Sequence, residues 1–220
     1  MNGFTSNRDD YRQRFLCHVH RLIHLGYSAL TPATFASAEE DDITGELCKH
    51  MQILTEDKPT EPWMSLYSVH DQHPLHGAIN PIGGRIKRGK RRPRLDIRFV
   101  SKSQSPSPRF CVEAKRLYRS DSVSSYIDDE GLGAFVSGYY AESDDAGGML
   151  SYVQTESIST WQTKIEARLV AARSSLTLTG GAKTKSHVFK GGPKNTFASR
   201  HQRAASGRPI DIFHTMLVFC

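Results

Sequence analysis

Two segments decide the fold that the sequence predicts: Pro93-Arg94-Leu95-Asp96 and Phe110-Cys111-Val112-Glu113-Ala114-Lys115. Both belong to runs that alternate apolar and polar side chains, the pattern of a strand with one buried face. The stretch 101–108 between them is rich in serine and proline, which favour a turn, so a hairpin is predicted. Pairing would bring Asp96 and Glu113 together, with Lys115 on the same face as Glu113. Two carboxylates and a lysine there indicate a Mg²⁺ site with an amine beside it.

This pattern resembles the PD-(D/E)xK superfamily of nucleases, the restriction-endonuclease-like enzymes. Pro93 and Asp96 stand for the first half of its motif, with two residues inserted between them, and Glu113-Ala114-Lys115 for the second half. The resemblance covers roughly 38–153 and implies an α/β domain with a mixed central sheet flanked by helices. The alternative is a surface hairpin with solvated charges.

A second helix is predicted to start near residue 37 or 38, because Ile43 and Leu47 recur at helical spacing. Glu40 near its start has two interpretations. With Ser37 three residues earlier it fits a capping box. In the superfamily, a glutamate on the helix before the sheet often completes the metal site, and the resemblance assigns Glu40 that role. The acids between 39 and 42 leave open which of them is meant.

The resemblance implies a complete hydrolytic site. Mg²⁺, with Mn²⁺ as a substitute, prefers oxygen ligands. It would be held by Asp96, Glu113 and the carbonyl of Ala114, with Glu40 reached directly or through water. Lys115 would orient or help to deprotonate a water molecule and offset negative charge. The catalytic set is therefore Glu40, Asp96, Glu113 and Lys115, acting without a covalent intermediate.

The positive charge of the chain is concentrated in one run. Residues 85–94 contain seven lysines and arginines and no acid, and removing them from the net charge of +6 leaves −1 for the rest. Such a local cluster is typical of a surface that binds a polyanion, and it leads directly into Asp96. A solvated loop is the alternative. The residues proposed to contact nucleic acid are Arg88, Lys90, Arg91, Arg92, Arg94, His201 and Arg203.

Length and composition indicate one domain spanning 1–220, with 1–36 as an N-terminal helical extension and 38–153 as the core motif region. No apolar run approaches the length of a membrane span, and the N-terminus lacks the apolar core of a signal peptide. The four cysteines show no paired spacing and are interpreted as reduced. A cytoplasmic protein is expected.

The C-terminal half predicts helices over 120–140 and 157–174 and a strand buried on both faces over 210–219. Residues 63–69 are predicted as the first strand, and a short strand is placed at 187–189. Ser199, His201 and Arg203 alternate and could contact phosphates, with an ordinary polar loop as the alternative. The stretches 130–140 and 146–153 resemble those that follow the catalytic strand in bacterial nucleases of anti-phage defence and restriction systems.

The sequence therefore predicts a Mg²⁺-dependent endonuclease that hydrolyses nucleic acid, DNA in preference to RNA, in bacterial anti-phage defence or restriction. Two alternatives remain open: a catalytically inactive nucleic-acid-binding module, and a structural subunit of a larger defence complex. The intact Asp96, Glu113 and Lys115 set argues against the first, because a binding protein has no reason to place carboxylates beside phosphates. Partner subunits and self-association into a homo-oligomer are both left open.

Overall fold

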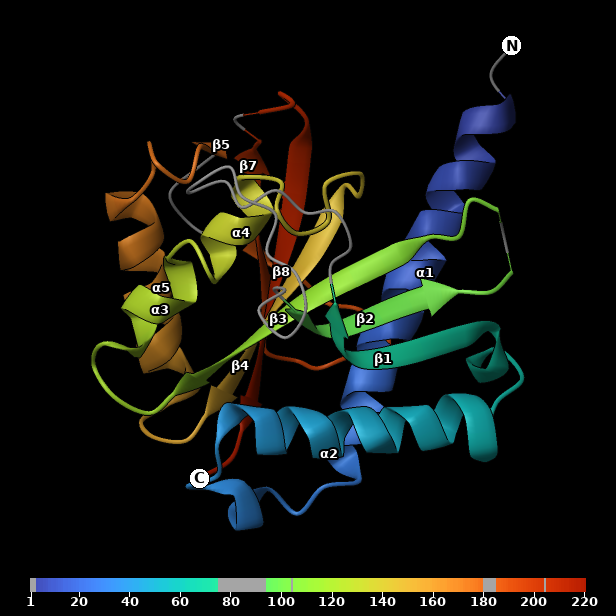
Figure 1. Cartoon of the computed structure of the whole chain (residues 1–220), viewed down its shortest axis with the longest axis horizontal. Helices are drawn as coiled ribbons and strands as arrows, with labels where there is room; N and C mark the ends of the chain where they lie inside the picture. Colours follow the sequence, from blue (N-terminus) through green and yellow to red (C-terminus); the bar gives the residue numbers. More distant parts are fainter. Residues whose placement is uncertain (1–2, 75–93, 104, 180–184, 204) are drawn as a thin grey trace.

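The computed structural model describes residues 3–74, 94–103, 105–179, 185–203 and 205–220 (Figure 1). Within these ranges one mixed sheet has the strand order β1-β2-β3-β4-β8-β7-β5, with β6 also paired to β7. The strands are β1 (Tyr67–Pro74), β2 (Arg94–Ser101), β3 (Arg109–Leu117), β4 (Ala146–Val153), β5 (Leu178–Thr179), β6 (Lys185–Ser186), β7 (Thr196–Gln202) and β8 (Pro209–Val218). The predicted α/β architecture is confirmed.

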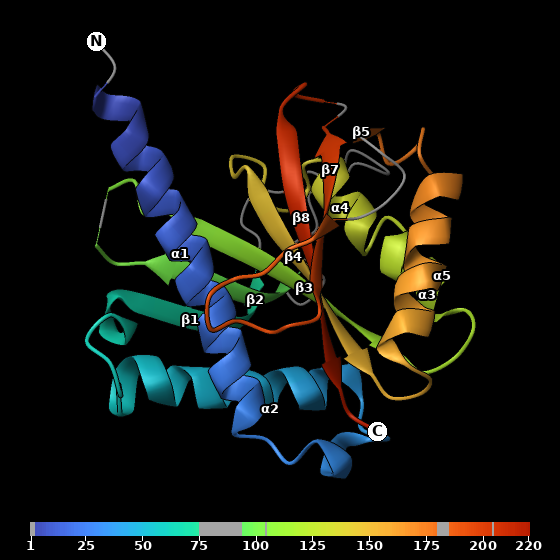
Figure 2. The same ribbon diagram turned by 180° about the vertical axis from the view of Figure 1, so that it is seen from behind.

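Helices cover both faces of the sheet (Figures 1 and 2). They are α1 (Gly3–Ser28), α2 (Glu40–Gln52), α3 (Ser122–Ile127), α4 (Leu132–Val136) and α5 (Ile158–Ala171), with short turns η1 (Pro32–Phe35), η2 (Ile53–Asp57) and η3 (Met64–Leu66). One buried cluster joins α1 and α2 to the sheet, and a second joins α3, α4 and α5 to it. Helix α1 therefore belongs to the core. No helix in the described ranges is long and apolar enough to span a membrane.

The predicted hairpin is confirmed. Strands β2 and β3 pair antiparallel from Val100 opposite Arg109 to Ile97 opposite Val112. Strand β3 then pairs in parallel with β4, and β4 in parallel with β8. All eight residues of β4 are buried, and the predicted C-terminal strand is β8. The hairpin is thus anchored to the centre of the sheet through β3.

Two glycines of β4 let neighbouring aromatic rings approach the strand backbone. A Cβ added at Gly147 would lie 2.7 Å from the ring of Phe135 on α4. A Cβ added at Gly148 would lie 2.9 Å from the ring of Phe110 on β3. Both separations are shorter than a carbon–carbon contact allows, so a larger residue at either position would push a core ring away from the sheet.

Several predicted boundaries were wrong. The first strand begins at Tyr67 rather than Trp63, because Met64 to Leu66 form the 3₁₀ turn η3. The helix predicted over 120–140 is broken into α3 and α4. Helix α3 ends before Asp128, whose backbone is extended, and α4 begins after Gly131, where a Cβ would lie 2.4 Å from the carbonyl oxygen of Tyr126. The short strand expected at 187–189 is replaced by β6 one or two residues earlier.

For the polar residues 199–203 the alternative to phosphate contacts is an ordinary loop, but 196–202 form β7. His201 Nδ1 donates to the carbonyl of Leu176 at 2.7 Å, so the neutral ring accepts from Ser199 Oγ at Nε2. Ser199 Oγ in turn accepts from His214 Nε2 at 2.8 Å, and His214 Nδ1 accepts from Tyr126 Oη at 2.8 Å. Burial lowers the pKa of His214 to about 3, in keeping with this neutral chain.

Candidate active site

The candidate site lies where β2 leaves β3. Strand β2 remains paired with β1 as far as Arg94 opposite Pro74, whereas its last partner on β3 is Val112, opposite Ile97. Beyond Val112, the edge of β3 is no longer paired with β2. The N-terminal end of α2 lies near this edge and near the C-terminal ends of β3 and β4 (Figures 1 and 2).

Along this part of β3, carboxylates accept hydrogen bonds that a neighbouring strand would otherwise accept. Asp96 Oδ2 accepts a hydrogen bond from the backbone N–H of Ala114 at 2.7 Å. Glu40 Oε2 accepts one from the N–H of Arg116 at 3.0 Å. The N–H and C=O of one strand residue point to the same side, so the carbonyl of Ala114 also faces this edge. The carbonyl of Leu117 faces the opposite edge of β3 and accepts from the N–H of Gln154, directly after β4.

Lys115 joins two of the three acids. Its Nζ lies 2.7 Å from Glu113 Oε1 and 3.4 Å from Glu40 Oε1. The Lys115 side chain is 16% exposed and that of Glu113 only 6%, so water screens their ion pair weakly. Asp96 is connected to this group indirectly, through its hydrogen bond from the backbone N–H of Ala114, which lies between Glu113 and Lys115. The four residues that the sequence selected therefore lie together, around one ammonium and three carboxyl groups.

Glu113 has one oxygen without a partner. Its Oε2 is buried and makes no hydrogen bond to any residue that the structure describes, while Oε1 is taken by Lys115. A buried carboxylate oxygen without a hydrogen bond or a cation is costly. Glu113 Oε2 is therefore well placed to bind a cation.

The pKa values reflect an excess of buried negative charge. Burial raises the pKa of Asp96 to about 6, although the Ala114 N–H and Lys115 oppose this. Burial and the neighbouring Asp96 raise the pKa of Glu113 well above its usual range. Burial would lower the pKa of Lys115, but Glu113 and Glu40 outweigh it and raise that pKa. A cation placed among these groups would relieve the repulsion.

Asp96→Asn is expected to stabilise the protein at pH 8 in the absence of metal, by about 1–2 kcal/mol after allowance for partial solvent screening. The folded-state pKa of about 6 exceeds the ordinary value of 3.8, so the folded state binds this proton more tightly. The resulting stability is greatest below pH 3.8 and is lost as the pH rises through 6. Urea unfolding at pH 8 and pH 5 measures it, with Asp121→Asn as an exposed control. A gain as large at pH 5 as at pH 8, or none at pH 8, would contradict this account.

The donor set fits a hard divalent cation. Asp96, Glu113 and the Ala114 carbonyl offer only oxygen, and Mg²⁺ takes few protein oxygens and keeps several waters. Among the residues described, no three histidine, cysteine or acidic side chains are already grouped around a common metal position. A set of two carboxylates, a carbonyl and water does not need such a group. The unpartnered Glu113 Oε2 is the specific observation in favour of the fit.

The proposed nucleic-acid contacts fare differently. Arg88, Lys90, Arg91 and Arg92 lie outside the described residues. Arg94 is exposed at the start of β2 and donates to Gln72 Oε1 at 2.9 Å. The assignments of His201 and Arg203 are corrected. His201 is fully buried in the hydrogen-bond chain, and the 2% exposed Arg203 donates to the carbonyls of Ala141 and Asp144, so neither reaches a phosphate in this structure.

Three further residues near the site were not selected from the sequence. Arg116 binds Glu39 and Gln154 with its guanidinium group while its N–H is held by Glu40. Gln154 lies directly after β4. Tyr140 is buried near the acids. Its burial raises its pKa most, and the nearby charges of Glu113 and Asp96 raise it further. Their roles depend on contacts between distant parts of the chain, and no local pattern marks them.

The chain matches no family model, no curated protein and no solved structure.

Proposed function

We propose that the chain is a Mg²⁺-dependent nuclease of the PD-(D/E)xK, restriction-endonuclease-like type, which hydrolyses phosphodiester bonds in nucleic acid. One observation carries the proposal: Asp96, Glu113 and Lys115 converge where the β2–β3 ladder opens, and Glu113 Oε2 is buried there without a partner. Buried, repelling carboxylates cost stability, which suits a site selected for chemistry rather than for folding.

Asp96, Glu113 and the Ala114 carbonyl would hold the metal. When bound, Mg²⁺ would polarise the scissile phosphate and lower the pKa of a coordinated water. Glu113 has a separate oxygen for each task, since Oε2 is free for the metal while Oε1 binds Lys115. Asp96 Oδ2 accepts from Ala114, and its Oδ1 would bind the metal.

Lys115 acts on water and on the phosphate. Its raised pKa keeps it protonated in the metal-free protein, so it can orient a nucleophilic water and offset the charge that develops on the phosphate. Glu40 supports this role. Its two oxygens are occupied by Lys115 Nζ and the N–H of Arg116, so we assign it to placing the ammonium rather than to direct metal binding.

The substrate is proposed to be DNA in preference to RNA. The run of seven cations over 85–94 precedes Asp96 in the sequence and would supply contacts to phosphates. A role in bacterial anti-phage defence or restriction, with partner subunits, rests on the sequence resemblance over 130–153.

The decisive experiment incubates the purified protein with supercoiled plasmid, single-stranded DNA and RNA. We expect cleavage with Mg²⁺ or Mn²⁺, none with EDTA, and binding without cleavage when Ca²⁺ replaces Mg²⁺. The plasmid should be cleaved faster than the RNA. Binding without cleavage under all metal conditions would favour the inactive binding module, and neither binding nor cleavage would favour a structural subunit.

A further inference from the structure

Gln154 uses every polar atom of its side chain at the junction of three chain segments. It follows β4 directly and is 6% exposed. Its Nε2 donates to the carbonyls of Phe35 and Ala38 at 2.8 and 2.9 Å, and its Oε1 accepts from Arg116 Nε at 2.9 Å. A buried amide satisfied in this way fixes the relative positions of its partners, because moving any one of them leaves a polar group without a bond.

The partners of Gln154 determine where α2 begins. Phe35 and Ala38 lie in the segment immediately before α2, whose N-cap is Glu39. The Glu39 side chain makes no capping hydrogen bond to its own helix and pairs instead with the guanidinium group of Arg116. The start of α2 is therefore held from the sheet, through Gln154 and Arg116, rather than by a local cap.

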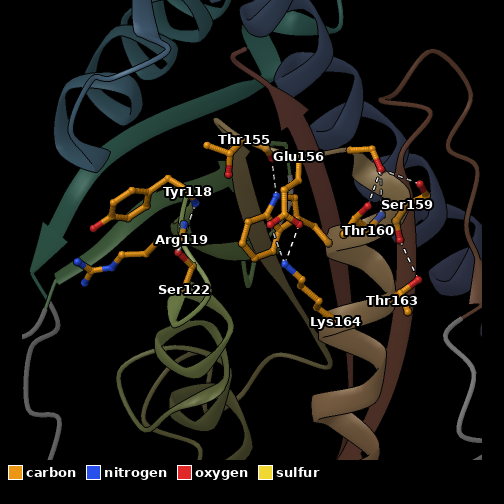
Figure 3. Close-up of polar contacts among 11 residues, drawn as sticks. Tyr118, Arg119, Ser122, Thr155, Glu156, Ser159, Thr160, Thr163 and Lys164 are labelled. Carbon is orange, nitrogen blue, oxygen red and sulfur yellow. Dashed lines mark hydrogen bonds and ion pairs between the residues drawn. The ribbon is translucent and has the colours of Figure 1, made fainter.

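The backbone of Gln154 and the turn that follows it, which leads into α5, make further hydrogen bonds and an ion pair (Figure 3 shows the turn). Its N–H donates to the carbonyl of Leu117 at 3.0 Å, which ties it to β3. In the turn that follows, Trp161 Nε1 donates to the carbonyl of Thr155 at 2.6 Å, and Lys164 pairs with Glu156 at 2.7 Å. The backbone of Gln154 is thus bonded to β3, and the residues after it are held by contacts of their own.

We propose that Gln154 is a positioning residue for the active site: through the segment 35–39 and Arg116 it fixes Glu40, and through Glu40 it fixes the ammonium of Lys115. Glu40 is the first residue of α2, so its carboxylate moves with the start of that helix. It contacts both Lys115 Nζ and the N–H of Arg116. The predicted effect on cleavage rests on the proposed nuclease function, whereas the effect on the Glu40 contacts does not.

The first test measures hydrogen exchange of individual amides by NMR. In Gln154→Leu, the backbone amide of Arg116 should exchange about tenfold faster, because its hydrogen bond to the Glu40 carboxylate is formed for a smaller fraction of the time. The amide of Ala114, capped by Asp96, should keep its protection and serves as the internal control. Gln162→Leu on α5, where Gln162 donates to the Glu166 side chain, is the matched variant and should change neither amide. Unchanged exchange at Arg116 in a folded Gln154→Leu protein would overturn the proposal.

Gln154→Glu tests the same contacts if the leucine variant does not fold. Glutamate can still accept from Arg116 Nε but, when ionised, presents no donor to the carbonyls of Phe35 and Ala38. The proposal therefore expects faster exchange at Arg116 in this variant too, at pH 7. Protection equal to that of the parent would show that the two carbonyl contacts do not place α2, and would overturn the proposal.

The second test measures cleavage by the same variants. Because Gln154 acts on Lys115 and not on the metal, kcat should fall about 10- to 100-fold while KM for DNA and Mg²⁺ affinity by calorimetry stay unchanged. If the parent does not cleave but Arg116 exchange responds, the nuclease proposal fails and the positioning role stands. If the parent cleaves and Gln154→Leu matches it in kcat, the positioning role fails and the nuclease proposal stands.

Discussion

Glu113→Gln is expected to reduce Mg²⁺-dependent cleavage by about 10³-fold or more, while the protein stays folded and at least as stable as the parent. Glutamine preserves the size of the side chain and can still accept from Lys115 Nζ, but it removes the charge that the unpartnered Oε2 would offer to a metal. Because burial raises the pKa of Glu113 well above its usual range, the ionised group costs stability at neutral pH, and its removal relieves that cost.

The measurement combines cleavage rate, Mg²⁺ affinity by calorimetry, and urea unfolding without metal. Glu46→Gln is the matched control, since Glu46 lies on α2 and pairs with Lys49 away from the site. That variant should keep its cleavage rate and Mg²⁺ affinity. Full activity in Glu113→Gln would remove the nuclease proposal, and lost activity together with lost folding would show that Glu113 is chiefly structural.

Lys115→Met is expected to retain Mg²⁺ and DNA binding yet lose about 10²- to 10⁴-fold in cleavage rate, the range typical of residues that position or transfer a proton. An ammonium has no lone pair to give a metal, so the ligands remain. Methionine keeps most of the apolar stem and removes the charge between Glu113 and Glu40. Lys115→Arg should not restore the rate, because the planar guanidinium is wider than the ammonium and cannot place its charge in the same way between Glu113 and Glu40.

Lys49→Met is the matched control, because Lys49 is 62% exposed and pairs with Glu46 on the same helix. Single-turnover cleavage rates, measured together with Mg²⁺ affinity by calorimetry, distinguish metal binding from the action of Lys115 on the water and the phosphate. Parental cleavage in Lys115→Met would mean that the lysine is a bystander. A loss of Mg²⁺ affinity as large as the loss of rate would mean that it holds the ligands in place.

The sequence predicted the centre of the site because that part is local. Asp96, Glu113 and Lys115 sit on two strands joined by one turn, and alternation alone puts the last two on one face. The choice of Glu40 depended on where its helix starts. The capping box with Ser37 was not formed, since α2 begins at Glu40 with Glu39 as its N-cap. Only the three-dimensional arrangement shows that Glu39 binds Arg116 while Glu40 binds Lys115.

The parts that were missed depend on long-range contacts. Gln154 is more than a hundred residues from Phe35 and Ala38, so nothing adjacent to it indicates a role. The alternation at Ser199 and His201 was a strand pattern, but polar residues were assumed to face solvent. They are buried because they satisfy one another through His214, which sequence spacing does not show.

The opening between β2 and β3 has a consequence for solubility. A strand edge with free N–H and C=O groups is a template for pairing with another molecule, and native proteins block such edges. Here Asp96 and Glu40 cover the N–H groups of Ala114 and Arg116 and bring negative charge to the same edge. The two acids therefore also protect this edge against the addition of a strand from another molecule, and a chain that lost both would expose a short, unpaired strand edge at the centre of the candidate site.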